Sequence, residues 1–392
     1  MRRRGALLLA AALALPVVAA PVAQAQGEGL VLGTALPTTG ALAAYGPATQ
    51  TAVLLAVEDA NAAGGVAGAE VTLVRGDSGD SPQAFATTAA RLRTAGAQAV
   101  VGPLSSALLL DSLASLDGLA FVAPAATSPL LNGRVARTSP SDDLQGMALA
   151  RLAAQSRVSR LAIVVPRAAI AMARAALSEA TLQSMTGEIV AYTPRARAAD
   201  VAESIARVHA DGVILMGGTE TTGIIRELLR RGLPATVLLT ATAGASIDGA
   251  ALPRGLLRGA RELGPDLRVP QPLADRIRAR DRSAKEISYA ALAYDAAAVA
   301  ILAAEQSARF LGEVTPDGIK AAIPSVSAVG TPCTTLASCL RKVRTGVDID
   351  YVGQSGAVDL SAAGDPLVAT YAVRTLGPNN EPGPRVRYVT VP

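Results

Sequence analysis

Tryptophan is absent from this 392-residue sequence, aromatic residues make up only 3% of it, and His209 is the single histidine. Hydrophobic residues still account for 50% of the chain, so alanine and aliphatic side chains must fill the interior. The one histidine ends a predicted helix, and there is no G-x-S-x-G motif, so no nucleophile has a base beside it. We therefore predict a protein that is not an enzyme and that uses no cofactor and no metal.

Residues 1–25 have the pattern of a secretory signal peptide. Three arginines at positions 2–4 precede an apolar run over residues 6–20, and A-Q-A at 23–25 is a small-x-small cleavage site. The apolar run is too short for a membrane span. We expect a mature protein that begins at Gln26 and resides in the periplasm.

The charge balance gives no sign of a nucleic-acid partner. Three of the positive charges lie in the signal peptide, so the formal net charge of +4 falls to +1 after cleavage. No block of lysine or arginine remains to form a basic patch. The protein is not expected to bind nucleic acid.

Only two cysteines are present, Cys333 and Cys339. A metal or redox pair is the alternative to a disulfide, but the spacing is not C-x-x-C and no histidine lies nearby. In an oxidising compartment their close spacing favours a local disulfide, worth about 2 kcal/mol for so short a ring.

Hydroxyl side chains follow two predicted strands in the middle of the chain. Residues 99–102 form a short apolar run, and Ser105 and Ser106 then precede a leucine stripe that predicts a helix closed by Gly118. A second apolar run at 119–122 leads into P-A-A-T-S at 124–128. Because ligands bind outside the carboxyl ends of parallel strands, these loops predict an anion pocket. The alternative is that the serines only cap a helix and that Thr127 is an ordinary turn residue.

Strand and helix patterns alternate from residue 30 to 131 and again from 161 to 239, which predicts two α/β lobes with doubly wound parallel sheets. We assign residues 26–139 and 259–365 to the first lobe, and residues 140–258 and 366–392 to the second. A β-hairpin is expected over 350–365 with its turn at 363–365, followed by a strand over 367–376.

These segments resemble the type I periplasmic binding proteins, and most closely the leucine/isoleucine/valine-binding branch. The resemblance rests on LPTTGALAAYG (36–46), NAAGGVAG (61–68), G-P-L-S-S (102–106), P-A-A-T (124–127) and RTSPSDDLQG (137–146). The stretches PCTTLASCL (332–340) and DIDYVGQSGAVDL (348–360) are similar to exported members with a stapled C-terminal loop. The resemblance implies two lobes joined by three crossovers, a ligand clamped in the cleft between them, and a monomer that docks on an ABC permease.

The resemblance also implies roles for residues of the first lobe. Ser106 and Thr127 would bind a ligand carboxylate through hydroxyl and backbone N–H groups. The carbonyl of Ala125 would accept from an ammonium group, and Tyr45 would cover the ligand. The remaining candidates of this lobe are Ser105 and Ala126, which adjoin these residues in sequence. Ser105 occupies the position of a disulfide cysteine in the best-known members, so that disulfide is absent here.

The second lobe departs from the family pattern. Ile170 and Thr219 occupy positions of family aromatics, and Thr242 lies where an acid would pair with an ammonium group. Glu220 replaces that acid only if its side chain turns into the cleft. An unpaired buried ammonium is costly, so the substitution argues against a plain amino-acid ligand.

We therefore expect an exported solute-binding protein that captures a small carboxylate-bearing solute, an amino acid or related organic acid, and delivers it to an ABC importer by hinge closure. The alternative is a ligand-poor relative that serves as an interaction or regulatory scaffold in the cell envelope.

Overall fold

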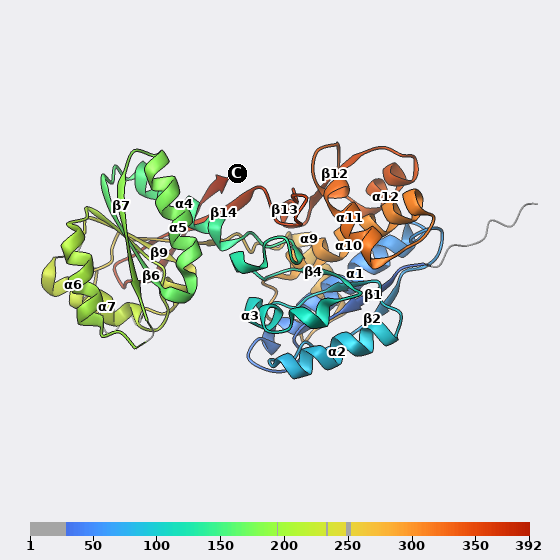
Figure 1. The fold of residues 1–392 in the computed structure, drawn as a ribbon, viewed down its shortest axis with the longest axis horizontal. Coiled ribbons are helices and arrows are strands. Elements are labelled where there is room, and N and C mark those ends of the chain that lie inside the picture. Colours follow the sequence, from blue (N-terminus) through green and yellow to red (C-terminus); the bar gives the residue numbers. More distant parts are fainter. Residues whose placement is uncertain (1–28, 194, 233, 248–251) are drawn as a thin grey trace, which may run out of the picture.

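The computed structural model describes residues 29–193, 195–232, 234–247 and 252–392, and these form two α/β lobes that lie side by side (Figure 1). The expected signal peptide and the mature N-terminus at Gln26 lie outside the described residues. Among the described residues, no helix is long and apolar enough to cross a membrane.

The first lobe is built on a five-stranded parallel sheet with the order β2-β1-β3-β4-β5. Its strands are β1 (Val31–Thr34), β2 (Thr72–Val74), β3 (Ala99–Val101), β4 (Ala120–Ala123) and β5 (Ala136–Arg137). The helices α1 (Gly46–Ala62), α2 (Pro82–Thr94) and α3 (Ser106–Leu110) follow β1, β2 and β3. Later parts of the chain return to this lobe as α9 (Gln271–Arg280), α10 (Ala290–Leu311), α11 (Pro316–Ser327) and α12 (Leu336–Arg344).

The second lobe contains a seven-stranded sheet with the order β15-β14-β10-β9-β8-β6-β7. Its parallel part consists of β6 (Arg160–Pro166), β7 (Thr186–Tyr192), β8 (Gly212–Leu215), β9 (Thr236–Thr240) and β10 (Arg261–Pro265). The strands β14 (Ala369–Leu376) and β15 (Pro382–Val391) extend it in antiparallel pairing. The helices of this lobe are α4 (Asp142–Gln155), α5 (Ile170–Leu182), α6 (Ala198–Val208), α7 (Thr221–Arg231) and the short α8 (Ala241–Ala245).

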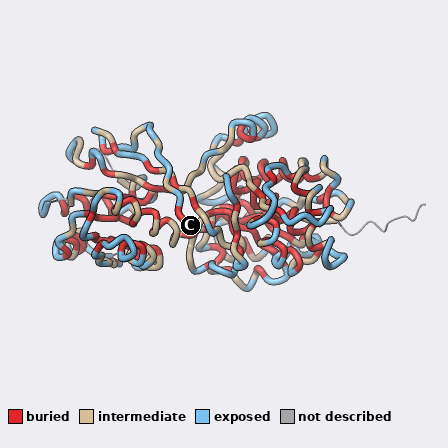
Figure 2. Tube along the Cα trace, turned by 90° about the horizontal axis from the view of Figure 1, so that it is seen from above, coloured by how far each residue is buried: buried red, intermediate tan, exposed pale blue. Residues whose placement is uncertain are grey.

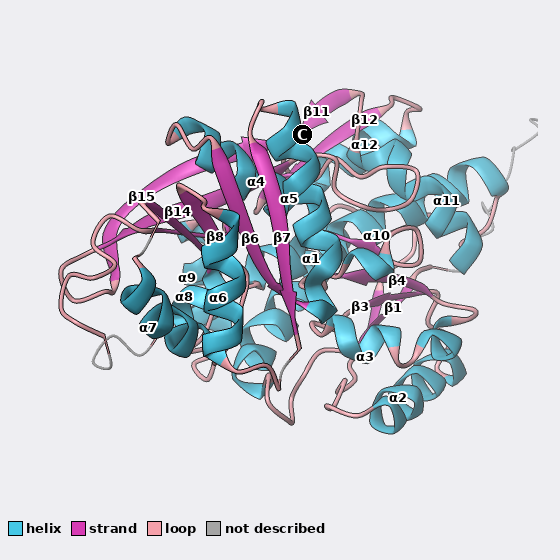
Figure 3. Ribbon diagram, turned by 60° about the vertical axis from the view of Figure 1, so that its left-hand side comes forward, coloured by secondary structure: helices cyan, strands magenta, loops and turns pink. Residues whose placement is uncertain are grey.

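Each sheet is covered on both faces, as expected for doubly wound lobes. Along β6, Leu161 and Ile163 belong to one hydrophobic cluster and Ala162 and Val164 to another. Alternate residues of a strand point to opposite faces, so both faces of this strand are buried. Figure 3 shows α5 on one side of this sheet and α6 and α7 on the other, and Figure 2 shows a buried interior within each lobe.

Three short crossovers join the lobes, between β5 and α4, between β10 and α9, and between a small third sheet and β14. That sheet contains β11 (Thr331–Cys333), β12 (Ile349–Gly353) and β13 (Gly356–Ala357). The crossovers contact one another, because the Tyr371 hydroxyl donates to the carbonyl of Ser141 at 3.3 Å and the Asp266 N–H donates to the carbonyl of Thr370 at 3.3 Å.

Three expectations require correction. The strand at 261–265 pairs with β9 and β14, so the returning segment of the first lobe begins after Pro265 rather than at residue 259. The hairpin expected over 350–365 is formed by β12 and β13 and turns at Gln354-Ser355. The chain also turns at 361–365 as expected, but that turn closes only a single antiparallel bridge, between Leu360 and Pro366. The helix expected to close at Gly118 is split, because α3 ends at Leu110 and a separate 3-10 turn covers Leu113–Leu116.

The predicted disulfide is confirmed. Cys333 at the end of β11 is bonded to Cys339 in α12, with their Cα atoms 5.5 Å apart. Both cysteines are buried, so the bond joins the small third sheet to the helix that packs on it.

Candidate functional site

The candidate residues of the first lobe lie on three loops at the carboxyl edge of the five-stranded sheet. One loop leads from β1 to Tyr45, the second leads from β3 to Ser105 and Ser106, and the third follows β4 and contains Thr127. The second loop begins at Gly102, whose φ is +121° and where a Cβ atom would lie 2.2 Å from the carbonyl oxygen of Ala35. Only glycine therefore allows this loop to leave the sheet beside the β1 loop.

Ser106 and Thr127, which the family resemblance implies as carboxylate ligands, lie in contact. The Ser106 hydroxyl oxygen accepts from the backbone N–H groups of Thr127 at 2.9 Å and Ser128 at 3.1 Å. The N–H of Thr127 is therefore committed to Ser106. Thr127 can still offer its hydroxyl to a ligand, and Ser106 can offer its hydroxyl proton, because an oxygen that accepts still has a proton to donate.

Ser105 caps α3, since its hydroxyl oxygen accepts from the N–H of Leu108 at 3.2 Å. Capping is thus one role of this side chain. Its hydroxyl proton is not used by the hydrogen bonds found within the described ranges, so a cap and a ligand contact are compatible.

The loop 125–128, named the carboxylate loop here, is tied to the hinge through Arg137. This arginine is fully buried, and its Nε donates to Asp365 at 2.8 Å on the third crossover. Its Nη1 donates to the carbonyls of Ala126 at 3.2 Å and Ser128 at 2.9 Å, and Nη2 donates to Asn132. One side chain therefore connects the carboxylate loop to two of the three chain segments that cross between the lobes.

Asp142, the first residue of α4, reaches the same loop from the other lobe. Its N–H donates to the carbonyl of Thr127 at 2.8 Å. Burial raises the pKa of its carboxyl to about 6, although the Thr127 hydroxyl and the positive charge of Arg137 both act to lower it.

Tyr45 packs edge-on against Tyr289, with ring centroids 5.2 Å apart. Tyr289 has a φ of +67° immediately before α10, an uncommon conformation for a non-glycine residue. Burial raises the pKa of Tyr289, with Tyr45 and Glu286 contributing further, so its ring stays neutral at physiological pH. The two tyrosines form an aromatic wall beside the first loop, of which the sequence identified only Tyr45 as a site residue.

Glu220 has partners within its own lobe. Its Oε1 accepts from the hydroxyl of Tyr192, at the end of β7, and from the N–H of Gly218 at 3.1 Å. Burial acts to raise the pKa of Glu220, but these hydrogen bonds together lower it below its usual value. Glu220 is therefore ionised and held at the carboxyl edge of the seven-stranded sheet.

The other candidates of the second lobe surround this edge. Ile170 is half-buried at the start of α5, Thr219 is exposed beside Glu220, and Thr242 is exposed in α8. The second lobe thus presents one carboxylate, two exposed hydroxyls and one aliphatic side chain after β6, β8 and β9.

The sequence missed Tyr192, Tyr289, Arg137 and Asp142 as residues of the site. Tyr192 shows that the second lobe has an aromatic side chain at its carboxyl edge, supplied by β7 rather than by the loops that follow β6 and β8. The raised pKa of Tyr192, caused by burial and by Glu220, keeps its hydroxyl protonated as a donor. The sequence signal that could have identified Tyr192 is its position as the last residue of a predicted strand.

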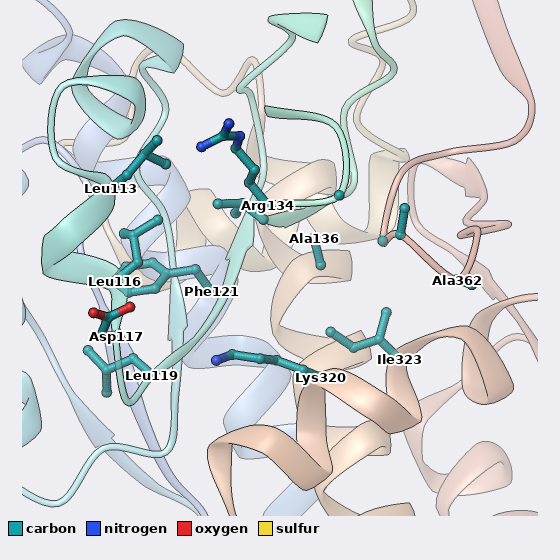
Figure 4. Close-up of a pocket in the computed structure, with 14 residues that line it drawn as sticks. Leu113, Leu116, Asp117, Leu119, Phe121, Arg134, Ala136, Lys320, Ile323 and Ala362 are labelled. Carbon is teal, nitrogen blue, oxygen red and sulfur yellow. The ribbon is translucent and has the colours of Figure 1, made fainter. Parts of the chain in front are cut away.

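A cavity of about 410 Å³ in the first lobe lies at the opposite edge of the sheet (Figure 4). Its walls include Leu116, Leu119 and Phe121, and Arg134 and Lys320 approach it from different elements. Leu116 and Leu119 precede β4, so this cavity adjoins the amino ends of the strands and is separate from the carboxylate loop.

The chain is similar to known proteins along most of its length. A sequence profile of the family described as periplasmic binding protein matches residues 30–345. The substrate-binding protein BasB of the chemotactic signal transduction system of Halobacterium salinarum is 28% identical over 376 residues, which cover 89% of this chain and 87% of BasB. The Leu/Ile/Val-binding protein BraC3 of Rhizobium johnstonii is 31% identical over 183 residues, 45% of this chain and 49% of BraC3.

Solved structures share the fold. The leucine-binding protein LivK of Thermotoga maritima has a TM-score of 0.63 at 18% identity, covering 92% of this chain and 98% of LivK. A solute-binding protein of R. palustris in complex with benzoate has a TM-score of 0.57 at 18% identity, covering 92% and 96%. With the profile match over residues 30–345 and two α/β lobes joined by three crossovers, this chain belongs to the periplasmic binding protein family.

Proposed function

We propose that this protein is an exported solute-binding protein that captures a small carboxylate-bearing molecule between its lobes and delivers it to an ABC permease. The observation that carries this proposal is the gathering of the Ser105, Ser106 and Thr127 hydroxyls at the carboxyl edge of the first sheet. Hydroxyl donors suit a carboxylate, and hydrogen bonds to a charged acceptor are the stronger kind. Capture proceeds by hinge closure about the three crossovers, the motion that periplasmic binding proteins use in general.

Affinity rests mainly on the first lobe, and the second lobe supplies shape. The position of Thr242 provides no acid for an ammonium group, and the Glu220 carboxylate is already stabilised by Tyr192 and Gly218. The Glu220 carboxylate therefore does not require a cationic ligand to balance its charge. The Tyr45 and Tyr289 rings offer an apolar surface for the remainder of the solute.

The ligands of related structures are consistent with this class. A substrate-binding protein of Streptococcus pneumoniae is complexed with isoleucine, and the R. palustris protein is complexed with benzoate. These two molecules share a carboxylate on an apolar skeleton, and only isoleucine has an ammonium group. We infer a ligand with the two shared features, either an amino acid or an organic acid.

A second candidate function is the presentation of the bound ligand to a signalling partner in the envelope, which the similarity to BasB over 89% of the chain favours. Ligand capture is the same in both cases, and the recipient of the closed form differs.

Calorimetry with leucine and with 4-methylpentanoate, the same skeleton without the ammonium group, tests the proposal. The 4-methylpentanoate should bind at least as tightly as leucine. Thr127→Ala should weaken its affinity about tenfold to a hundredfold, the equivalent of roughly 1.5–3 kcal/mol for a donor to a charged group.

Thr94→Ala is the matched control, because Thr94 is exposed on α2 and its hydroxyl donates only to its own helix, at the carbonyl of Ala90. This variant should bind as the wild type does. A leucine affinity more than tenfold above that of 4-methylpentanoate would mean that an ammonium partner exists, and Glu220 would be that residue.

A further inference from the structure

Two arginines line a pocket of the second lobe that has no acidic side chain in its walls. The pocket has a volume of about 300 Å³ and is enclosed by the C-terminal end of α4 and by the strands β10, β14 and β15. Arg261 comes from β10 and Arg387 from the edge strand β15. Because Arg261 is the first residue of β10, the pocket adjoins the amino edge of the parallel strands, opposite the edge that carries Glu220.

The pairing of the strands brings the two arginines to one face of the sheet. Arg261 lies opposite Thr375 of β14, and Arg387 lies opposite Val373 of the same strand. Residues two apart on a strand point to the same face, and all four of these residues line the pocket. The two guanidinium groups therefore approach one cavity from either side of β14.

Neither arginine has a carboxylate partner within the part of the chain that the structure describes. Glu262 follows Arg261 in sequence, but it points to the other face of the sheet, where it lies opposite Arg374. The Arg261 guanidinium donates to the hydroxyl of Ser156, which is a neutral group. The Arg387 side chain makes no hydrogen bond and no ion pair with a described residue. Two like charges are thus left uncompensated beside one pocket.

The chemistry of this pocket favours an anion. A guanidinium stays protonated in proteins, so both side chains remain cationic, although burial lowers the pKa of Arg261 and the charge of Arg387 lowers it further. An anion between them replaces their repulsion by two attractions. Guanidinium groups bind carboxylate and phosphate oxygens through paired hydrogen bonds, and Thr375 and Gln155 add neutral donors to the walls.

We propose that this pocket is a second ligand site, which binds a doubly charged oxyanion of the phosphate class through Arg261 and Arg387 together. The phosphate is either the free inorganic ion or a phosphate group on a small molecule. A pocket of about 300 Å³ is at the lower end of the size of small-molecule sites, so it leaves room for an organic substituent. The site goes beyond the proposed function and does not depend on it, because its residues belong to the second lobe alone.

The test is calorimetric titration of the mature protein at pH 8 and low ionic strength, with inorganic phosphate and with glycerol 3-phosphate. Arg387→Gln should weaken phosphate binding about tenfold to a hundredfold, because it removes hydrogen bonds between charged groups. Arg385→Gln is the matched control. Arg385 is exposed on the same strand, two residues earlier, and does not line the pocket, so this variant loses the same charge and should bind as the wild type does. Tighter binding of glycerol 3-phosphate identifies the ligand as a phosphate ester, and equal or weaker binding identifies it as the free ion.

Thermal unfolding gives a second readout. Without an anion, Arg387→Gln relieves a repulsion, so its midpoint at low salt should be no lower than that of the wild type. Saturating phosphate should raise the wild-type midpoint by mass action, and should raise that of Arg387→Gln less. Thr127→Ala should keep the full rise, which separates this site from the carboxylate loop.

Three results overturn the inference, and each leaves the proposed function standing. They are no phosphate binding by the wild type, equal phosphate affinities of Arg387→Gln and Arg385→Gln, and an equal rise of the midpoint in sodium chloride of the same ionic strength. Arg387 then only protects the edge strand β15 from pairing with another chain.

Discussion

Replacing Arg137 by methionine should destabilise the protein far more than the loss of a surface arginine. The Arg137 side chain is 1% exposed and that of Asp365 is 14% exposed, and their atoms are 2.8 Å apart. Without the arginine, Asp365 keeps the Gly133 N–H at 3.1 Å, and the carbonyls of Ala126 and Ser128 lose the donors that Arg137 supplied. Removing one partner of a buried pair costs about 3–5 kcal/mol, and we expect a loss near 4 kcal/mol.

Urea unfolding followed by far-ultraviolet circular dichroism measures this loss, because the chain has no tryptophan for a fluorescence signal. Arg280→Met is the control. Arg280 pairs with Glu58 at 2.9 Å, but both side chains are roughly half exposed, so the loss should be at most about 1 kcal/mol. The reasoning is wrong if Arg137→Met costs no more than Arg280→Met. Arg137→Met should also weaken carboxylate binding, since the carboxylate loop loses its tie to the hinge.

Three further predictions concern other parts of the molecule. Replacing Cys333 and Cys339 by serine should lower the free energy of unfolding by about 2 kcal/mol, and an unchanged urea midpoint would refute a stabilising role for this disulfide. Burial acts to raise the pKa of Asp77, but hydrogen bonds from Thr39, Thr38 and Gly79 lower it to about 2, so its stabilising contribution is present above pH 4 and is lost as the pH falls toward 2. Asp77→Asn should therefore reduce stability at neutral pH and flatten acid unfolding between pH 4 and pH 2, whereas an unaltered acid transition would contradict this. Glu220→Gln should leave the affinity for 4-methylpentanoate within about threefold of the wild type by calorimetry, because Tyr192 and Gly218 contact the group that is changed; a tenfold loss would show that Glu220 touches the ligand.

The regular parts of the fold follow from local pattern. The apolar run at 99–101 is buried on both faces of β3, and Ser81 and Pro82 begin α2 as a cap and a first-turn proline should. The single helix predicted after Ser106 was wrong for a physical reason. Leu109 and Leu116 are both buried in one cluster, and either one helix or two short turns satisfies that spacing.

The edge strand β15 was missed because its side chains alternate poorly between buried and exposed. β15 lies at the edge of the sheet, where many of its side chains are exposed to solvent, so an alternating apolar pattern is not required. The expected start of the returning segment at residue 259 was wrong for a related reason, since prolines at 265, 270 and 272 obscure the short strand β10.

The candidate site was only partly accessible from sequence. Ser106 and Thr127 follow predicted strands, so their proximity could be inferred from the meeting of strand ends, and the structure brings them into contact. Asp142 and Arg137 act through contacts that depend on how the crossovers pass the carboxylate loop. Tyr192 meets Glu220 from a different strand, 28 residues earlier in the chain. No local spacing encodes such contacts.

Small-angle X-ray scattering of the mature protein, with and without saturating 4-methylpentanoate, tests the central claim most directly. If the lobes close on a carboxylate held at Ser106 and Thr127, the radius of gyration should decrease on ligand addition. The decrease should be retained in Thr94→Ala and should require a higher ligand concentration in Thr127→Ala. A radius of gyration that stays the same at saturation, with binding confirmed by calorimetry, would contradict capture by closure of the two lobes.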